Sequence, residues 1–96
     1  RPVHGLHEGL EVGAWRDGWR IRHISPVVNG AFSLWLVPPG ADAQTVPVIL
    51  FDAEARAPHC QPTEALSPGL RVCLPGTDDG RDKVLSVLRA VSGAAP

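Results

Sequence analysis

Apolar and polar residues alternate along three consecutive stretches in the first half of this 96-residue chain. The pairs Asp17-Gly18 and Asn29-Gly30 separate the stretches, which are residues 10–16 (LEVGAWR), 19–28 (WRIRHISPVV) and 31–37 (AFSLWLV). Alternation with a period of two is typical of β-strands, and Asp-Gly and Asn-Gly favour two-residue hairpin turns. The pattern therefore predicts a three-stranded antiparallel meander over residues 10–37.

Pro26 interrupts the second stretch. Proline has no N–H to donate to a sheet, and the middle strand of a meander has a neighbour on each side. We therefore expect a β-bulge or a strand end near Ser25 and Pro26.

The rest of the chain predicts two more strands and a helix. Residues 46–51 (VPVILF) and 70–74 (LRVCL) are short apolar runs of strand length, and residues 1–9 form an irregular lead-in. The proline-rich residues 53–69 form an irregular connection with one helical turn around 63–66. Residues 78–92 form a helix, because their apolar residues recur at helical spacing: Val84, Leu85, Val87, Leu88 and Val91.

These elements define the expected fold class. The chain length favours a single domain over residues 1–96. We predict an α+β, mostly β fold, in which an antiparallel meander forms either a half-rolled sheet or a small SH3-like barrel and is followed by a C-terminal helix. The open or half-rolled sheet is preferred, because the apolar stripe of the helix needs a sheet to cover.

The two hairpin turns also predict which side chains share a face of the meander. Two-residue loops pair Trp15 with Arg20, Ile24 with Trp35 and His23 with Leu36. The core face then holds Leu10, Val12, Ala14, Trp19, Ile21, His23, Val27, Phe32, Leu34 and Leu36. The opposite face holds Glu11, Trp15, Arg20, Arg22, Ile24, Ser33, Trp35 and Val37.

The opposite face combines tryptophan with arginine, the residue types that are enriched where proteins bind one another. We therefore predict Trp15, Arg20, Arg22 and Trp35 as binding residues. Two other interpretations stay open. The arginine stems could lie over the indole rings and simply protect the sheet, or the rings could stack on the bases of a single-stranded nucleic acid.

Net charge and hydropathy bear on which classes of partner are favoured. The formal net charge is −1, which does not favour nucleic acid, and no apolar run is long enough to span a membrane. The chain begins without methionine, so we also expect that it could be an accessory or regulatory domain of a larger enzyme or assembly. Nothing in the sequence indicates a compartment.

The residues that could carry chemistry form no recognisable catalytic or metal motif. His4, His7, His59, Cys60 and Cys73 include zinc-binding atom types, but no Cys-x-x-Cys pair is present. We therefore expect no cofactor, no metal and no catalysis on this chain. Cys60 and Cys73 could form a disulfide that closes a loop of about 14 residues, or they could be two unrelated thiols.

The order of motifs in residues 10–52 resembles that of Tudor and agenet domains, which are small SH3-like barrels. The similar segments are EVGAWRDGWRIRHI and, after it, NGAFSLWLV. The resemblance implies a domain that reads methylated residues with an aromatic cage, in which Trp19 occupies a cage position. Arg20 stands where these domains often carry a second aromatic residue, and VPPGA replaces their acidic and aromatic segment after the third strand.

The function expected from the sequence is a noncatalytic module that binds a protein or peptide, or the rest of a larger polypeptide, through its tryptophan and arginine face. Exposed strand edges could also accept a strand from the partner. A single-stranded nucleic-acid binder is the less favoured alternative.

Overall fold

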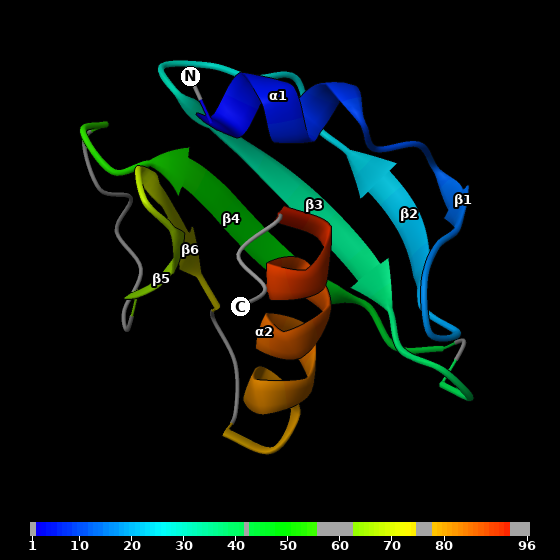
Figure 1. The fold of residues 1–96 in the computed structure, drawn as a ribbon. Coiled ribbons are helices and arrows are strands. Elements are labelled where there is room, and N and C mark those ends of the chain that lie inside the picture. The colour runs from blue at the N-terminus through cyan, green and yellow to red at the C-terminus, as the bar shows by residue number, and fades with distance from the viewer. Residues whose placement is uncertain (1, 42, 56–62, 75–77, 93–96) are drawn as a thin grey trace.

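The computed structural model describes residues 2–41, 43–55, 63–74 and 78–92. They form six strands and two helices (Figure 1). The elements are α1 (Pro2–Glu8), β1 (Gly13–Ala14), β2 (Arg20–Ile24), β3 (Ala31–Val37), β4 (Val46–Asp52), β5 (Thr63–Ser67), β6 (Leu70–Cys73) and α2 (Asp78–Ser92).

The strands make one antiparallel sheet in the order β1-β2-β3-β4-β6-β5. The sheet is open, with β1 and β5 as its edges, so the predicted α+β, mostly β class is confirmed in its open form rather than as a closed barrel. None of the described helices is long and apolar enough to cross a membrane.

Both helices pack on the same face of the sheet, which we call the inner face (Figure 1). Helix α2 contributes Val84, Leu85, Val87 and Leu88 to the core, and α1 contributes Val3. The strands supply the other half of this apolar layer, and burial of these side chains is the main force that holds helices to sheet. The inner-face core residues of the strands are Ile21, Phe32, Leu34, Leu36, Val48, Leu50, Leu66, Leu70 and Val72.

The two predicted hairpin turns are present, but the strands beside them contain bulges. Asp17 and Gly18 have φ of 56° and 83°, and Asn29 and Gly30 have φ of 54° and 77°, as a type I′ turn requires. Next to the first turn, Trp15 N–H donates to the Trp19 carbonyl at 2.9 Å, although a regular two-residue hairpin would pair Arg16 with Trp19. One residue is therefore inserted in the first strand.

Two further bulges lie in the second strand. The register runs from Ile21↔Leu36 to His23↔Trp35, which leaves Arg22 as an extra residue. Beyond Ile24, Ser25 pairs with Ser33 and Val28 pairs with Ala31, so two residues, 26 and 27, stand opposite one. The expectation of a bulge and a strand end near Pro26 is confirmed.

These bulges correct several predicted positions. Because the register shifts at Arg22, His23 pairs with Trp35 rather than Leu36, and Ile24 pairs with Leu34 rather than Trp35. His23 therefore leaves the predicted core face and Ile24 joins it. Val12 is also not a core residue, since 64% of it is exposed.

Two elements differ from prediction altogether. Residues 2–8 form helix α1, not an irregular lead-in. Residues 63–67 form strand β5, not an irregular connection with a helical turn, and β5 pairs with β6 across a turn at Pro68 and Gly69. The first strand is also shorter than residues 10–16, because only Gly13 and Ala14 pair with β2.

A buried carboxylate holds the first turn of α1 against the end of β4. Asp52 is 1% exposed, and its Oδ1 accepts the Val3 N–H at 3.0 Å. The first N–H groups of a helix have no partner within the helix, so this contact satisfies one of them. Asp52 thereby links the first turn of α1 to the end of β4.

Candidate functional site

We call the face of the sheet opposite the helices the outer face. It carries some, but not all, of the predicted tryptophan and arginine residues. Strand pairing places Ala31, Ser33, Trp35 and Val37 of β3 on it, because their neighbours Phe32, Leu34 and Leu36 belong to the inner core. The same pairing places Pro47, Ile49 and Phe51 of β4 on the outer face. Val37, Phe51 and Cys73 are buried there, so exposure is concentrated around β2 and the middle of β3.

Trp35 lies at the centre of this exposed part. It is half-buried, and its indole meets the exposed His23 imidazole edge-on, with ring centroids 5.0 Å apart and planes at 61°. The two residues are cross-strand partners, which explains the contact. An edge-on pair leaves part of both rings free to contact another molecule.

Arg20 and Arg22 flank this aromatic pair along β2. Both are exposed, Arg20 opposite Val37 and Arg22 as the extra residue of the bulge beside His23. We call Arg20, Arg22, His23 and Trp35 the basic–aromatic face. It contains three of the four predicted binding residues.

Trp15, the fourth predicted binding residue, does not belong to this face. The bulge next to the first turn changes its register, and Trp15 packs against the inner core in a partly buried position. Its neighbour Ala14 pairs with Arg20 instead. Trp19 is 6% exposed and lies in the core, as the register argument predicted.

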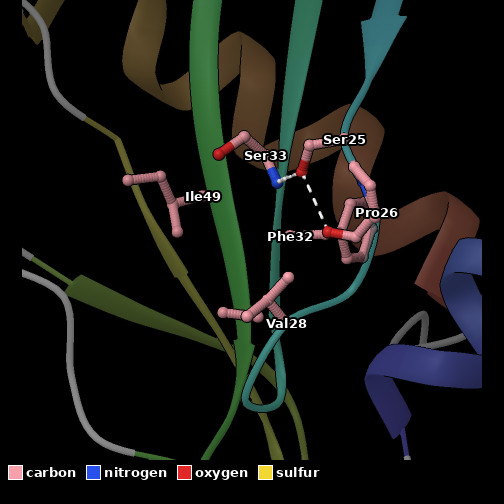
Figure 2. A pocket seen from close by; sticks show the side chains of 7 residues that line it. Ser25, Pro26, Val28, Phe32, Ser33 and Ile49 are labelled. Carbon is pink, nitrogen blue, oxygen red and sulfur yellow. Dashed lines mark hydrogen bonds between the residues drawn. The ribbon is translucent and has the colours of Figure 1, made fainter.

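Ser25 gives the sheet an unusual hydrogen-bond pattern beside Pro26 (Figure 2). Ser25 N–H donates to the Ser33 carbonyl at 3.0 Å, while the Ser25 hydroxyl accepts the Ser33 N–H at 2.7 Å. In a regular antiparallel pair the Ser25 carbonyl would accept that N–H. The carbonyl is instead 2.9 Å from His7 Nε2 of α1, and since a carbonyl can only accept, Nε2 carries the proton.

A shallow pocket opens on the outer face at this point, with a volume of about 260 Å³. Figure 2 shows it from the outer side, with α2 behind the strands. Its rim includes Val28, one of the two large hydrophobic residues that are most exposed in the described chain, at 62%. We call it the Pro26 pocket; its lining is Ser25, Pro26, Val28, Ala31, Phe32, Ser33 and Ile49.

The residues considered for metal binding or catalysis are not brought together. His7 is engaged with Ser25 and meets the Phe32 ring edge-on at 4.8 Å, whereas His4 is exposed. No group of three or more metal-ligating side chains is found within the described residues. Cys73 is disulfide-bonded, and Cys60, its predicted partner, lies outside those residues, as does His59.

Sequence reasoning missed His23, Ser25 and the pocket as parts of the site. The sequence did contain a signal for His23. The predicted register placed His23 on an otherwise apolar face and Ile24 on a polar face, and both placements indicate that this register is wrong by one residue. The pocket could not be predicted from the sequence, because Ile49 lies beside Ser33 only through the pairing of β3 with β4.

Comparison with protein-family models, with curated proteins and with solved structures finds no match to this chain. The resemblance of residues 10–52 to Tudor and agenet domains therefore stays a prediction. The residues of the outer face are therefore the basis for a functional proposal.

Proposed function

We propose that this chain is a noncatalytic module that binds a protein or peptide through its outer face. The binding surface consists of the basic–aromatic face and the Pro26 pocket. Trp15 is omitted from it because that side chain packs against the core.

One observation carries this proposal. Both described helices cover the inner face, and the register of β3 places a half-buried tryptophan on the opposite face beside two exposed arginines. Tryptophan and arginine contribute disproportionately to binding energy, because they combine a large contact area with groups that fix orientation. A surface needed only for solubility would not require an indole at its centre.

A displayed library of random peptides tests the proposal without assuming a sequence. We expect the wild-type protein to retain peptides that Trp35→Ala does not retain. Circular dichroism and thermal unfolding of each variant check that the fold survives. Arg89→Ala is the matched control, since Arg89 is an exposed arginine on α2, which packs on the inner face.

Two results would contradict the proposal. One is a library that yields no peptides for the wild type. The other is equal binding by the wild type and Trp35→Ala, which would mean that the captured peptides bind elsewhere.

A further inference from the structure

Asn29 is the only asparagine of this chain, and Gly30 follows it. Asparagine is among the chemically labile residues of proteins, because the backbone nitrogen of the next residue can attack its side-chain carbonyl carbon. A side chain on that next residue obstructs the attack, and glycine has none. The Asn29-Gly30 pair is therefore the sequence in which this reaction is least obstructed.

The fold leaves both reacting groups accessible at the tip of the hairpin that leads into β3. Asn29 is exposed, and the turn is closed by Val28 and Ala31, whose backbone groups exchange hydrogen bonds of 2.8 and 3.1 Å. Within the described parts of the chain, neither the Gly30 N–H nor the Asn29 side chain makes a hydrogen bond. No bond therefore has to be broken at either group before the attack.

On the side of β2, little backbone pairing holds this turn in place. The Val28↔Ala31 pair is an isolated bridge, and the bulge at residues 26 and 27 separates it from the pairs of β2 with β3. The attack requires rotation of the main chain at Asn29, which opens this one bridge and leaves the ladder of β2 and β3 intact. Local opening of this kind costs far less free energy than global unfolding, so the reaction is open to the folded protein.

The reaction needs water and no other reagent. The Gly30 nitrogen bonds to Asn29 Cγ, the Cγ–Nδ2 bond breaks, and the side-chain amide leaves as ammonia with the proton of the Gly30 N–H. A succinimide ring remains, and water opens it at either carbonyl to give aspartate or isoaspartate. In isoaspartate the main chain runs through the former side chain, so it is one atom longer, and the former main-chain carbonyl becomes a free carboxylate.

The turn packs against the end of β4, where an extra main-chain atom changes a chain of contacts. The Gly30 carbonyl accepts the Asp52 N–H at 2.9 Å, and a Cβ on Gly30 would lie 3.3 Å from Asp52 Oδ2. Asp52 Oδ1 accepts the Val3 N–H of α1. A longer main chain between Val28 and Gly30 displaces the Gly30 carbonyl, and the two hydrogen bonds of Asp52 weaken as a result.

We infer that Asn29 is a site of spontaneous deamidation in the folded protein, and that its isoaspartate product weakens the link that runs from this turn through Asp52 to α1. The aspartate product keeps the link, because Asp-Gly also suits a type I′ turn. Both products add one negative charge, and only isoaspartate lengthens the main chain. The inference is independent of the proposed binding function.

Mass spectrometry of the purified protein, incubated at mildly alkaline pH, tests the site. We expect a product in which OH replaces the side-chain NH2 of Asn29, and peptide mapping resolves it into an aspartate and an isoaspartate form. The Asn29→Asp variant is the control for the two glutamines of the chain and keeps its mass. The same protein unfolded in urea gives the rate without the fold. Conversion of the unfolded chain but not of the folded protein over the same interval overturns the inference.

Hydrogen exchange tests the effect on α1, with the isoaspartate form separated by chromatography and Asn29→Asp as the matched reference of equal charge. We expect the Asp52 and Val3 amides to exchange roughly five- to tenfold faster in the isoaspartate form, as for the loss of one hydrogen bond. The Trp15 amide, which bonds to the Trp19 carbonyl beside the first turn, is the control and exchanges equally in both. Equal exchange of the Asp52 and Val3 amides in the two proteins overturns the link from the turn to α1.

Discussion

Ser25 joins three parts of the molecule through three different groups. Its N–H and hydroxyl both bond to Ser33 of β3, and its carbonyl accepts a hydrogen bond from His7 of α1. The Ser25 hydroxyl takes the place of its carbonyl at the point where the strand leaves the ladder, next to Pro26. A residue without a hydroxyl at this position would leave either the Ser33 N–H or His7 without its partner.

A second residue-scale constraint lies at Gly30, whose φ is 77° and whose position lacks room for a side chain. A Cβ there would lie 3.3 Å from Asp52 Oδ2 and 3.3 Å from Ala55 Cβ. Gly40 has a similar φ of 73°, but a Cβ there meets nothing within 4 Å. The two positions therefore share a backbone conformation that strains any other residue, and they differ in steric room.

We predict that Gly30→Ala destabilises the protein more than Gly40→Ala. The strain of a non-glycine residue in this conformation costs about 1–2 kcal/mol in either variant. Gly30→Ala additionally pushes against Asp52, which holds α1. Urea unfolding measures the difference, and equal midpoints for the two variants would contradict this account.

At the scale of single residues, the sequence predicted burial well where the side chain is large and apolar. Trp19, Ile21, Phe32, Leu34 and Leu36 were placed in the core and are buried there. The roles of Asp52 and Ser25 could not be predicted, because each depends on a partner brought close by the fold. The Val3 N–H lies 49 residues from Asp52 in sequence.

At the scale of elements, the second strand shows why alternation alone misplaced His23 and Ile24. The inward apolar residues of this stretch are Trp19, Ile21, Ile24 and Val27, with gaps of two, three and three residues. A strict period of two cannot place all four on one face. Each gap of three residues marks a bulge, one at Arg22 and one at Pro26. The spacing of the apolar residues therefore indicated the correct faces, whereas the register derived from the turns did not.

The two misassigned elements have different causes. In α1, Val3 and Leu6 have helical spacing, with Pro2 in the first turn and Gly9 after the end, so a signal was present but short. In β5, the residues Glu-Ala-Leu favour helix locally. Pairing with β6 across the Pro68 and Gly69 turn outweighs that preference.

Helix α1 offers a prediction at this scale, because its two histidines differ only in their surroundings. His7→Ala removes the hydrogen bond to Ser25 and the edge contact with Phe32, so we expect a loss of about 1–2 kcal/mol in unfolding free energy. His4→Ala changes an exposed residue and stays within about 0.5 kcal/mol. Chemical denaturation compares them, and equal losses would show that the His7 contacts do not hold α1.

At the scale of the whole molecule, the packing of both described helices on one face of the sheet decides how much of the site was predictable. The apolar stripe of α2 required a sheet face to cover, and the open sheet followed from that requirement. Arg20, Arg22 and Trp35 were then left on or beside the other face. Trp15 was misplaced, since a single inserted residue in the first strand reverses which way its side chain points.

The cysteines carry a further whole-molecule prediction. Cys73 is buried and disulfide-bonded, and the predicted partner is Cys60. We expect peptide mapping without reductant to find the two cysteines in one cross-linked fragment. The Cys60→Ser variant should lose about 3 kcal/mol in unfolding free energy, as expected for a loop of this length. A dimer on a non-reducing gel would contradict the intramolecular pairing.

The extra residue at Arg22 has a consequence for related sequences of different length. If Arg22 were deleted, Ile21 would still pair with Leu36 and the following histidine with Trp35, and alternation would become regular. We therefore expect the sheet to persist without Arg22, which lies exposed in the bulge beside His23. A chain shorter by this one residue should keep the whole sheet and present a less basic outer face, so a single deletion would change what the face can bind within one fold.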